Sequence, residues 1–110
     1  MAKKRISTKV NKVVKEYVRR LMNQEKIPIE RVIVFGSQAK GNPHLWSDID
    51  VCIISPKLGV SLKTLQFLLK KRTREEVIAG LEPVGFSGKD FKAGSSLINE
   101  IKKTGISLKI

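Results

Sequence analysis

Two aspartates, one residue apart, open the segment "DIDVCII" at residues 48–54, which is otherwise apolar. In a β-strand, residues i and i+2 point to the same face, so Asp48 and Asp50 would lie side by side. Neighbouring carboxylates repel, and burying one without a cation is costly. Oxygen ligands of this kind suit Mg²⁺, which keeps several waters and bridges to substrate phosphates. The alternative is a solvated pair at the first turn of the strand, with one carboxylate capping a backbone N–H.

A glycine and a serine directly follow an earlier apolar run, "RVIVF" at residues 31–35. Gly36 allows close backbone approach, and Ser37 offers a hydroxyl and an N–H. A helix beginning here would add further N–H donors and a dipole that favours phosphate. A phosphate-binding turn after one strand and a carboxylate pair on the next are the two halves of a nucleoside-triphosphate site. Taken alone, Gly-Ser would indicate only an ordinary strand-to-helix turn.

The elements that must position these residues are predicted from apolar periodicity. A helical stripe between residues 10 and 22 predicts a first helix with Ser7 or Thr8 as its N-cap. The runs at 31–35 and 48–55 predict buried strands, joined by a turn that could open a short helix. Later segments predict a long helix over 61–80, a short strand from Leu81 ending at Pro83 or shortly after, a helix near 95–103, and a terminal edge strand at 106–110.

This order predicts an α/β fold, a small mixed β-sheet flanked by helices, because strands and helices alternate while some connections suit antiparallel neighbours. The 110 residues are typical of one domain. We therefore expect a single domain over residues 1–110, with residues 1–8 as a flexible basic terminus. No apolar run approaches the roughly 20 residues of a membrane-spanning helix, and no apolar segment follows the basic terminus as in a secretory signal. A cytoplasmic protein is expected.

Charge and cysteine content narrow the classes of partner. Lys and Arg number 22 against 10 acids, a net charge of +12, which favours a polyanionic partner or substrate. The alternative is a solubility surface, because the bases are scattered as well as clustered, and nucleic-acid binding stays open. The single Cys52 excludes an internal disulfide, and with one His the common Cys/His zinc sites are excluded too.

The stretch "FGSQAKGNPHLWSDIDVCII", residues 35–54, resembles the signature of the DNA polymerase beta-like nucleotidyltransferase superfamily. It most resembles the minimal nucleotidyltransferases, small domains with G-S-x-A-x-G, a short loop, then S-D-I-D and an apolar tail. The matching positions are Gly36, Ser37, Ala39, Gly41, Ser47, Asp48, Ile49 and Asp50.

The resemblance implies a site and a cofactor. Nucleotide would be bound by Gly36, Ser37, Lys40 and Ser47, and Asp48 and Asp50 would bind Mg²⁺ and act in catalysis. Family members add a third carboxylate from a neighbouring strand, which binds a second metal or serves as the base. Of the ten acids, only Glu82 lies in an apolar, strand-like context, so it is assigned this catalytic and metal-binding role. The alternative is a strand-end glutamate hydrogen-bonded to solvent.

Two positions depart from the family pattern. Many relatives have arginines where this chain has Gln38 and Lys40; Lys40 keeps a charge without the bidentate fork, and Gln38 loses the charge. The third acid is Glu82 where Asp is more usual, and its longer side chain would shift the second metal.

The resemblance implies a Mg²⁺-dependent nucleotidyltransferase that moves NMP, with AMP the expected one, from an NTP such as ATP to a hydroxyl. The implied acceptor is a HEPN-type helical partner protein, with this chain as the antitoxin-like half of a toxin–antitoxin pair. The alternative is a catalytically weak domain of the same fold that binds a partner or RNA. The acceptor, the preferred base and any homo-oligomeric state are left open by the sequence.

Overall fold

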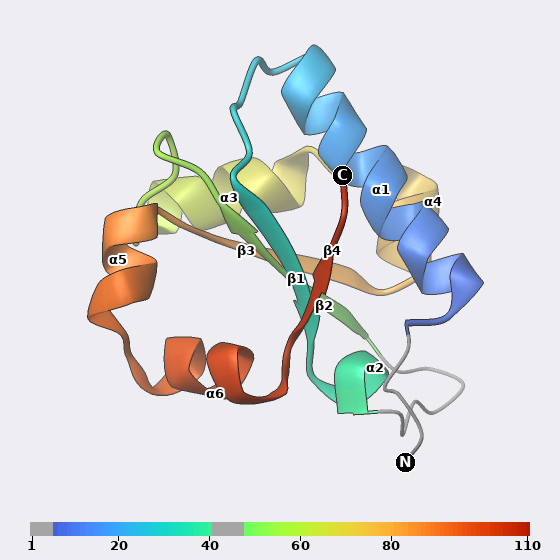
Figure 1. Cartoon of the computed structure of the whole chain (residues 1–110). Coiled ribbons are helices and arrows are strands. Elements are labelled where there is room, and N and C mark those ends of the chain that lie inside the picture. The colour runs from blue at the N-terminus through green and yellow to red at the C-terminus, as the bar shows by residue number, and fades with distance from the viewer. Residues whose placement is uncertain (1–5, 41–47) are drawn as a thin grey trace.

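The structure is a computed structural model that describes residues 6–40 and 48–110 (Figure 1). Its elements, in chain order, are α1 (Thr8–Asn23), β1 (Arg31–Phe35), α2 (Ser37–Lys40), β2 (Ile49–Ile54), α3 (Leu62–Lys70), α4 (Arg74–Ile78), β3 (Leu81–Phe86), α5 (Gly88–Ala93), α6 (Ser96–Thr104) and β4 (Ile106–Leu108). The strands form one sheet in the order β3-β2-β1-β4. Strand β1 is antiparallel to β2 and β4, whereas β2 and β3 are parallel. The predicted α/β fold with a mixed sheet is therefore confirmed.

Each face of the sheet is covered by its own helices. On one face, alternate strand residues such as Val34 and Val51 pack with α1 and with Leu68 of α3. On the other face, Cys52 and Phe86 pack with the apolar residues of α5 and α6. This division follows from the period of two along each strand, which sends successive side chains to opposite faces. None of the described helices is long and apolar enough to cross a membrane.

The predicted first helix begins where its cap was expected. The Ser7 hydroxyl accepts a hydrogen bond from the Val10 N–H at 3.2 Å, and Thr8 is the first residue of α1. These two residues therefore belong to the folded domain, although residues 1–8 were expected to be a flexible terminus; residues 1–5 lie outside the described part. Tyr17, fully buried on α1, donates to the Leu68 carbonyl at 2.6 Å and fixes α3 to α1.

The single helix predicted over 61–80 is wrong, because the chain forms two helices there, α3 and α4. Thr73 starts the second one with a reciprocal capping box: its hydroxyl accepts from the Glu76 N–H, and the Glu76 carboxylate accepts from the Thr73 N–H. The expected apolar stripe is also largely exposed, since Leu62 is 68% and Val77 49% exposed. Periodicity alone gave no sign of the cap.

Strand β3 runs through Pro83 to Phe86, whereas its end was predicted at Pro83 or shortly after. The Gly80 carbonyl accepts from Ile49 and the Phe86 carbonyl accepts from Ser55. Backbone groups alternate in direction along a strand, so these two bonds imply that the N–H and C=O groups of residues 80, 82, 84 and 86 all point toward β2. The proline nitrogen therefore faces the open edge of the sheet, where no donor is required. The predicted turn after β3 contains α5, which the Ser87 hydroxyl caps.

Candidate active site

Strand pairing brings Asp50 and Glu82 together at the beginning of β2 and β3. Asp50 is the register partner of Phe35 on β1 and of Glu82 on β3. Because Cys52 and Phe86 belong to the core beneath α5 and α6, strand alternation places Asp50 and Glu82 on that same face. The two residues are far apart in sequence, and the parallel β2–β3 pairing makes them neighbours.

The electrostatics at this edge of the sheet are those of uncompensated acids. Asp48 and Glu82 are exposed, and Asp50 is half-buried. Burial raises the pKa of Asp50, and the negative charges of Asp48 and then Glu82 raise it further. Among residues 6–40 and 48–110, none of the three forms an ion pair with a Lys or Arg. Such an arrangement would be relieved by a bound cation.

Gly36 brings the other half of the sequence motif against Asp50. Its φ of +72° lies in the left-handed region, and a Cβ at this position would come within 2.4 Å of Asp50 Oδ2. Only glycine fits here, on both backbone and steric grounds. The turn that follows β1 and the carboxylate on β2 are therefore in direct van der Waals proximity, as the sequence motif predicted.

The turn itself is shorter than a phosphate-binding helix. Helix α2 spans Ser37–Lys40, and its Ala39 and Lys40 N–H groups both donate to the Gly36 carbonyl at 3.1 Å. These two donors are thus engaged within the turn. Ser37, for which the sequence predicts nucleotide binding, is the first residue of this turn.

Lys40 reaches across to α6. Its Nζ lies 3.2 Å from Glu100 Oε1, and both side chains are about half exposed. The sequence placed Glu100 on the polar face of a helix and gave no signal for this pair, because residues 40 and 100 meet only through the fold. Ser47, the remaining predicted nucleotide-binding residue, lies outside the described residues.

The nucleotidyltransferase domain family matches residues 9–103, almost the whole chain. The chain belongs to this family. No functionally curated protein is significantly similar to this nucleotidyltransferase domain.

Three solved structures share the nucleotidyltransferase fold. A candidate nucleotidyltransferase from Sulfolobus solfataricus has a TM-score of 0.64 at 16% identity, over 90% of this chain and 78% of that one. A toxin–antitoxin structure with AMP-PNP has a TM-score of 0.57 at 18% identity, over 86% and 72%. A mutant of the toxin–antitoxin MntA–HpeT has a TM-score of 0.56 at 16% identity, over 91% and 72%. In that mutant, two aspartates two positions apart are replaced by glutamate.

The carboxylates of this nucleotidyltransferase domain are oxygen donors of the kind that Mg²⁺ prefers. Among the described residues, no group of three His, Cys, Asp or Glu side chains is arranged to hold a metal ion. Mg²⁺ needs no such cage, because one or two carboxylates, substrate phosphates and waters commonly complete its shell. The oxygen donors of Asp48 and Asp50 therefore suit Mg²⁺, with Glu82 beside them.

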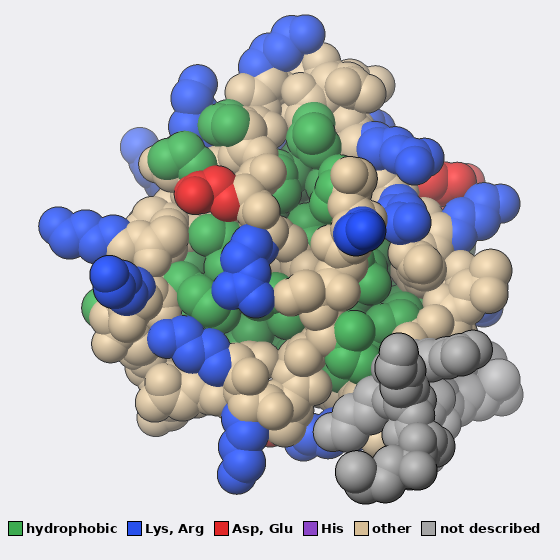
Figure 2. Space-filling model, viewed as in Figure 1, with side chains coloured by type: hydrophobic (Ala, Val, Ile, Leu, Met, Phe, Trp, Pro, Cys, Tyr) green, Lys and Arg blue, Asp and Glu red, His purple; other side chains and the backbone are tan. Residues whose placement is uncertain are grey.

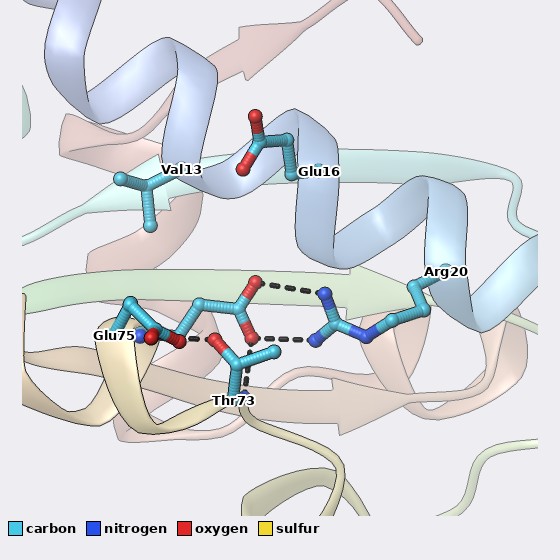
Figure 3. A pocket seen from close by; sticks show the side chains of 6 residues that line it. Val13, Glu16, Arg20, Thr73 and Glu75 are labelled. Carbon is cyan, nitrogen blue, oxygen red and sulfur yellow. Dashed lines mark hydrogen bonds and ion pairs between the residues drawn. The ribbon is translucent and has the colours of Figure 1, made fainter.

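A separate hollow of about 240 Å³ lies between α1 and α4, on the α1 side of the sheet, and Figure 3 shows its lining. The Arg20 guanidinium donates two hydrogen bonds, of 2.5 and 3.0 Å, to the Glu76 carboxylate. It also donates to the Lys71 carbonyl. The same carboxylate accepts from the Thr73 N–H at 2.8 Å. Arg20 of α1 and Glu76 of α4 thus pair with each other across this hollow, and we call the region the α1–α4 joint. The sequence pattern gave no indication that Glu76 is a buried acid.

Proposed function

We propose that this domain transfers a nucleoside monophosphate, AMP in the first instance, from an NTP to a hydroxyl of a partner protein, in the presence of Mg²⁺. The observation that carries the proposal is the contact of Gly36 with Asp50, which joins a phosphate-binding turn to a pair of carboxylates. The family supports nucleotidyl transfer in general. The nucleotide analogue in one structural relative and the paired aspartates altered in another support the same chemistry here.

Each site residue has a distinct role in the proposed reaction. Ser37 and Lys40 hold the phosphates, with Ser47 as a further contact, and Gly36, which has no side chain, lets the turn lie against Asp50. Asp48 and Asp50 supply the ligands of Mg²⁺. When bound, this ion neutralises phosphate oxygens and stabilises the charge that develops in the transition state.

In this proposal, Glu82 acts on the acceptor. The acceptor oxygen attacks the α-phosphorus and forms a new P–O bond, while the bond to the leaving pyrophosphate breaks. The proton of the acceptor hydroxyl passes to the Glu82 carboxylate, which acts as general base. The register pairing of Glu82 with Asp50, a proposed Mg²⁺ ligand, supports this role.

The partner in this proposal is a HEPN-type helical protein, and this chain is the antitoxin-like half of the pair, working in the cytoplasm. Two structural relatives are described as toxin–antitoxin proteins, which supports a two-protein system. A basic surface that binds nucleic acid is less well supported. Figure 2 shows Lys and Arg side chains spread over the visible face, separated by apolar and neutral atoms, where a polyanion would favour one continuous stripe.

The test is label transfer to a co-expressed HEPN-type protein. With Mg²⁺, label from α-³²P-ATP should appear on the partner, whereas label from γ-³²P-ATP should not. The Asp48→Asn/Asp50→Asn variant should abolish transfer, and Glu82→Gln should slow it by roughly 10²–10⁴-fold, as expected for loss of a general base.

The matched control is Glu16→Gln/Glu75→Gln, which removes two exposed acids near α1 and α4 and makes the same change in net charge. This variant should transfer label as the wild type does. Undiminished transfer by the double aspartate variant would refute the assigned site, and transfer of γ-label would indicate a kinase.

A second candidate is a catalytically weak domain that acts by binding its partner. It is favoured by the ion pair of Lys40 with Glu100, which engages a side chain that the proposed reaction needs for the phosphates. In this case, partner affinity would be unchanged by EDTA and by the double aspartate variant, and no label would be transferred.

A further inference from the structure

An apolar surface lies along the free edge of β3, outside the candidate active site. A hollow of about 140 Å³ there is lined by residues of three separate segments: Val60, Ser61, Thr64, Leu65, Val84, Gly85, Phe86 and Leu97. We call this set the β3-edge surface. Val60 is 69%, Leu65 38% and Leu97 43% exposed, and Leu62 next to them is 68% exposed. Large apolar side chains gathered in this way around a hollow mark a site of protein contact.

The backbone at this edge is closed to an added strand. The backbone groups of Leu81, Pro83 and Gly85 point away from β2, toward the open edge of the sheet. This follows because the residues that alternate with them in β3 bond to β2. Pro83 has no N–H to offer, and the Leu81 carbonyl already accepts from Arg72 at 2.9 Å. A partner would therefore have to bind through side chains in the hollow, since a continuous backbone ladder cannot form.

The charges of the chain segments that contribute to the β3-edge surface favour one kind of partner. The segment 57–66 carries Lys57 and Lys63 and no acid, and the segment 84–97 carries Lys89 and Lys92 against the single Asp90. A second copy of this chain would bring the same four lysines and a net charge of +12, which opposes self-association. The complementary surface is one with apolar side chains flanked by aspartates and glutamates.

The position of the surface connects it with the candidate active site. Glu82, Val84 and Phe86 alternate along the same face of β3. With a rise of about 3.3 Å per residue, Glu82 and Phe86 lie roughly 13 Å apart along the strand. A protein bound over Leu65 and Leu97 would thus stand beside the proposed catalytic base.

We propose that the β3-edge surface docks the acceptor protein through an apolar patch flanked by acidic residues. The inference rests on the proposed function, because it takes the docked protein to carry the accepting hydroxyl. Docking at β3 places that hydroxyl near Glu82. It also accounts for apolar side chains that the core of this domain leaves exposed.

The experiment measures affinity for the HEPN-type protein by isothermal titration calorimetry, without nucleotide and at two salt concentrations. Val60→Glu/Leu65→Glu should weaken binding at least tenfold, since acids are placed against an acidic, apolar partner. The matched control is Val77→Glu/Ile78→Glu, which alters two exposed apolar residues on α4, 49% and 75% exposed, outside the surface. It should change affinity less than threefold. Lys63→Glu should weaken binding and reduce its dependence on salt.

Equal losses for the two apolar double variants, unchanged affinity for both, or no complex with the wild type would overturn the inference. Sedimentation velocity supplies another decisive result. If the chain alone dimerises and Val60→Glu/Leu65→Glu makes it monomeric, the occupant is a second copy and the proposal is wrong.

The docking inference and the proposed function fail in different ways. Asp48→Asn/Asp50→Asn should retain full affinity while losing label transfer. Binding that depends on the β3-edge surface without any transfer by the wild type would leave docking in place and refute the enzymatic function. Transfer that depends on the aspartates, with affinity insensitive to Val60→Glu/Leu65→Glu, would refute docking alone.

Discussion

Two acidic regions of this small domain differ in whether a basic side chain compensates their negative charge. At the α1–α4 joint, the buried Glu76 carboxylate is held by Arg20 and by the Thr73 N–H. At the start of β2 and β3, Asp50 faces Asp48 and Glu82, and no Lys or Arg among the described residues pairs with any of them. The chain carries 22 bases, so a shortage of cations does not explain the difference.

The comparison separates a buried acid that is paired with a cation from acids for which we propose a bound ligand. The hollow at the α1–α4 joint is lined by titratable groups, and the buried one, Glu76, is paired with Arg20. The acids on the sheet edge have no such compensation, which is the pattern expected where binding or catalysis opposes stability. Four experiments can break or sharpen this contrast.

The largest effect is expected for Arg20→Ala. This change leaves Glu76, whose side chain is 7% exposed, buried without its cation, and a broken buried pair costs about 3–5 kcal/mol. The free energy of unfolding in urea at pH 7 is the measurement. The control Arg19→Ala removes the exposed neighbour and should stay within about 0.5 kcal/mol of wild type. Equal losses would remove the contrast between the two regions.

Gly36→Ala should cost about 1–3 kcal/mol, because an alanine would be forced to a φ near +72°. Its Cβ would also press on Asp50 Oδ2. Gly59→Ala is the control, because its Cβ would meet no atom within 4 Å. Thermal unfolding should show it unchanged or slightly more stable. A harmless Gly36→Ala would mean that the turn and Asp50 are not in contact.

Added Mg²⁺ should stabilise the wild type, because a ligand of the folded state alone adds about 1.4 kcal/mol at ten times its Kd. Melting curves at constant ionic strength measure this effect. The shift should vanish in Asp48→Asn/Asp50→Asn and persist in Glu16→Gln/Glu75→Gln, which removes acids from the other region. Loss of the shift in both variants would show that Mg²⁺ binds without regard to the site.

Without divalent ions, Asp50→Asn should modestly stabilise the fold at neutral pH, the smallest of the four effects. The raised pKa of Asp50 means that the folded state keeps this proton to higher pH than the unfolded chain does. Its stabilising contribution is therefore complete below the ordinary Asp pKa and is lost as the pH rises through the raised value. Unfolding free energies from pH 3 to pH 7 in EDTA should show the variant's advantage appear across this range. Glu76→Gln should be destabilising instead at neutral pH.

Much of the fold could be predicted from the sequence, because the strands have continuous apolar runs and Ser7 and Ser61 stand as helix caps. The break at Thr73 was missed, since a capping box inside an apolar pattern competes with the period that predicts a continuous helix. Helix α5 was missed because six residues carry too little periodicity to distinguish a helix from a turn.

The candidate site was predictable in its residue types and less so in its geometry. The motif identified Gly36 and Asp50, and their contact confirms that the two halves meet. The Lys40–Glu100 pair joins residues remote in sequence, and no local pattern reports such a contact. The roles of Asp48, Asp50 and Glu82 stay predictions, as do the single domain and the HEPN-type partner.

The crowding of Gly36 against Asp50 has an evolutionary consequence. An alanine at position 36 meets both an unfavourable φ and the Asp50 carboxylate, so a lineage that retains this aspartate is constrained to retain the glycine as well. Replacing Asp50 by a smaller residue removes the collision and leaves only the backbone strain. Loss of the aspartate first is therefore easier than loss of the glycine first, because replacing Gly36 while Asp50 is present causes the collision. A Gly-Ser turn in a distant relative would accordingly be evidence of shared ancestry, whereas only the carboxylates would be evidence that the chemistry is retained.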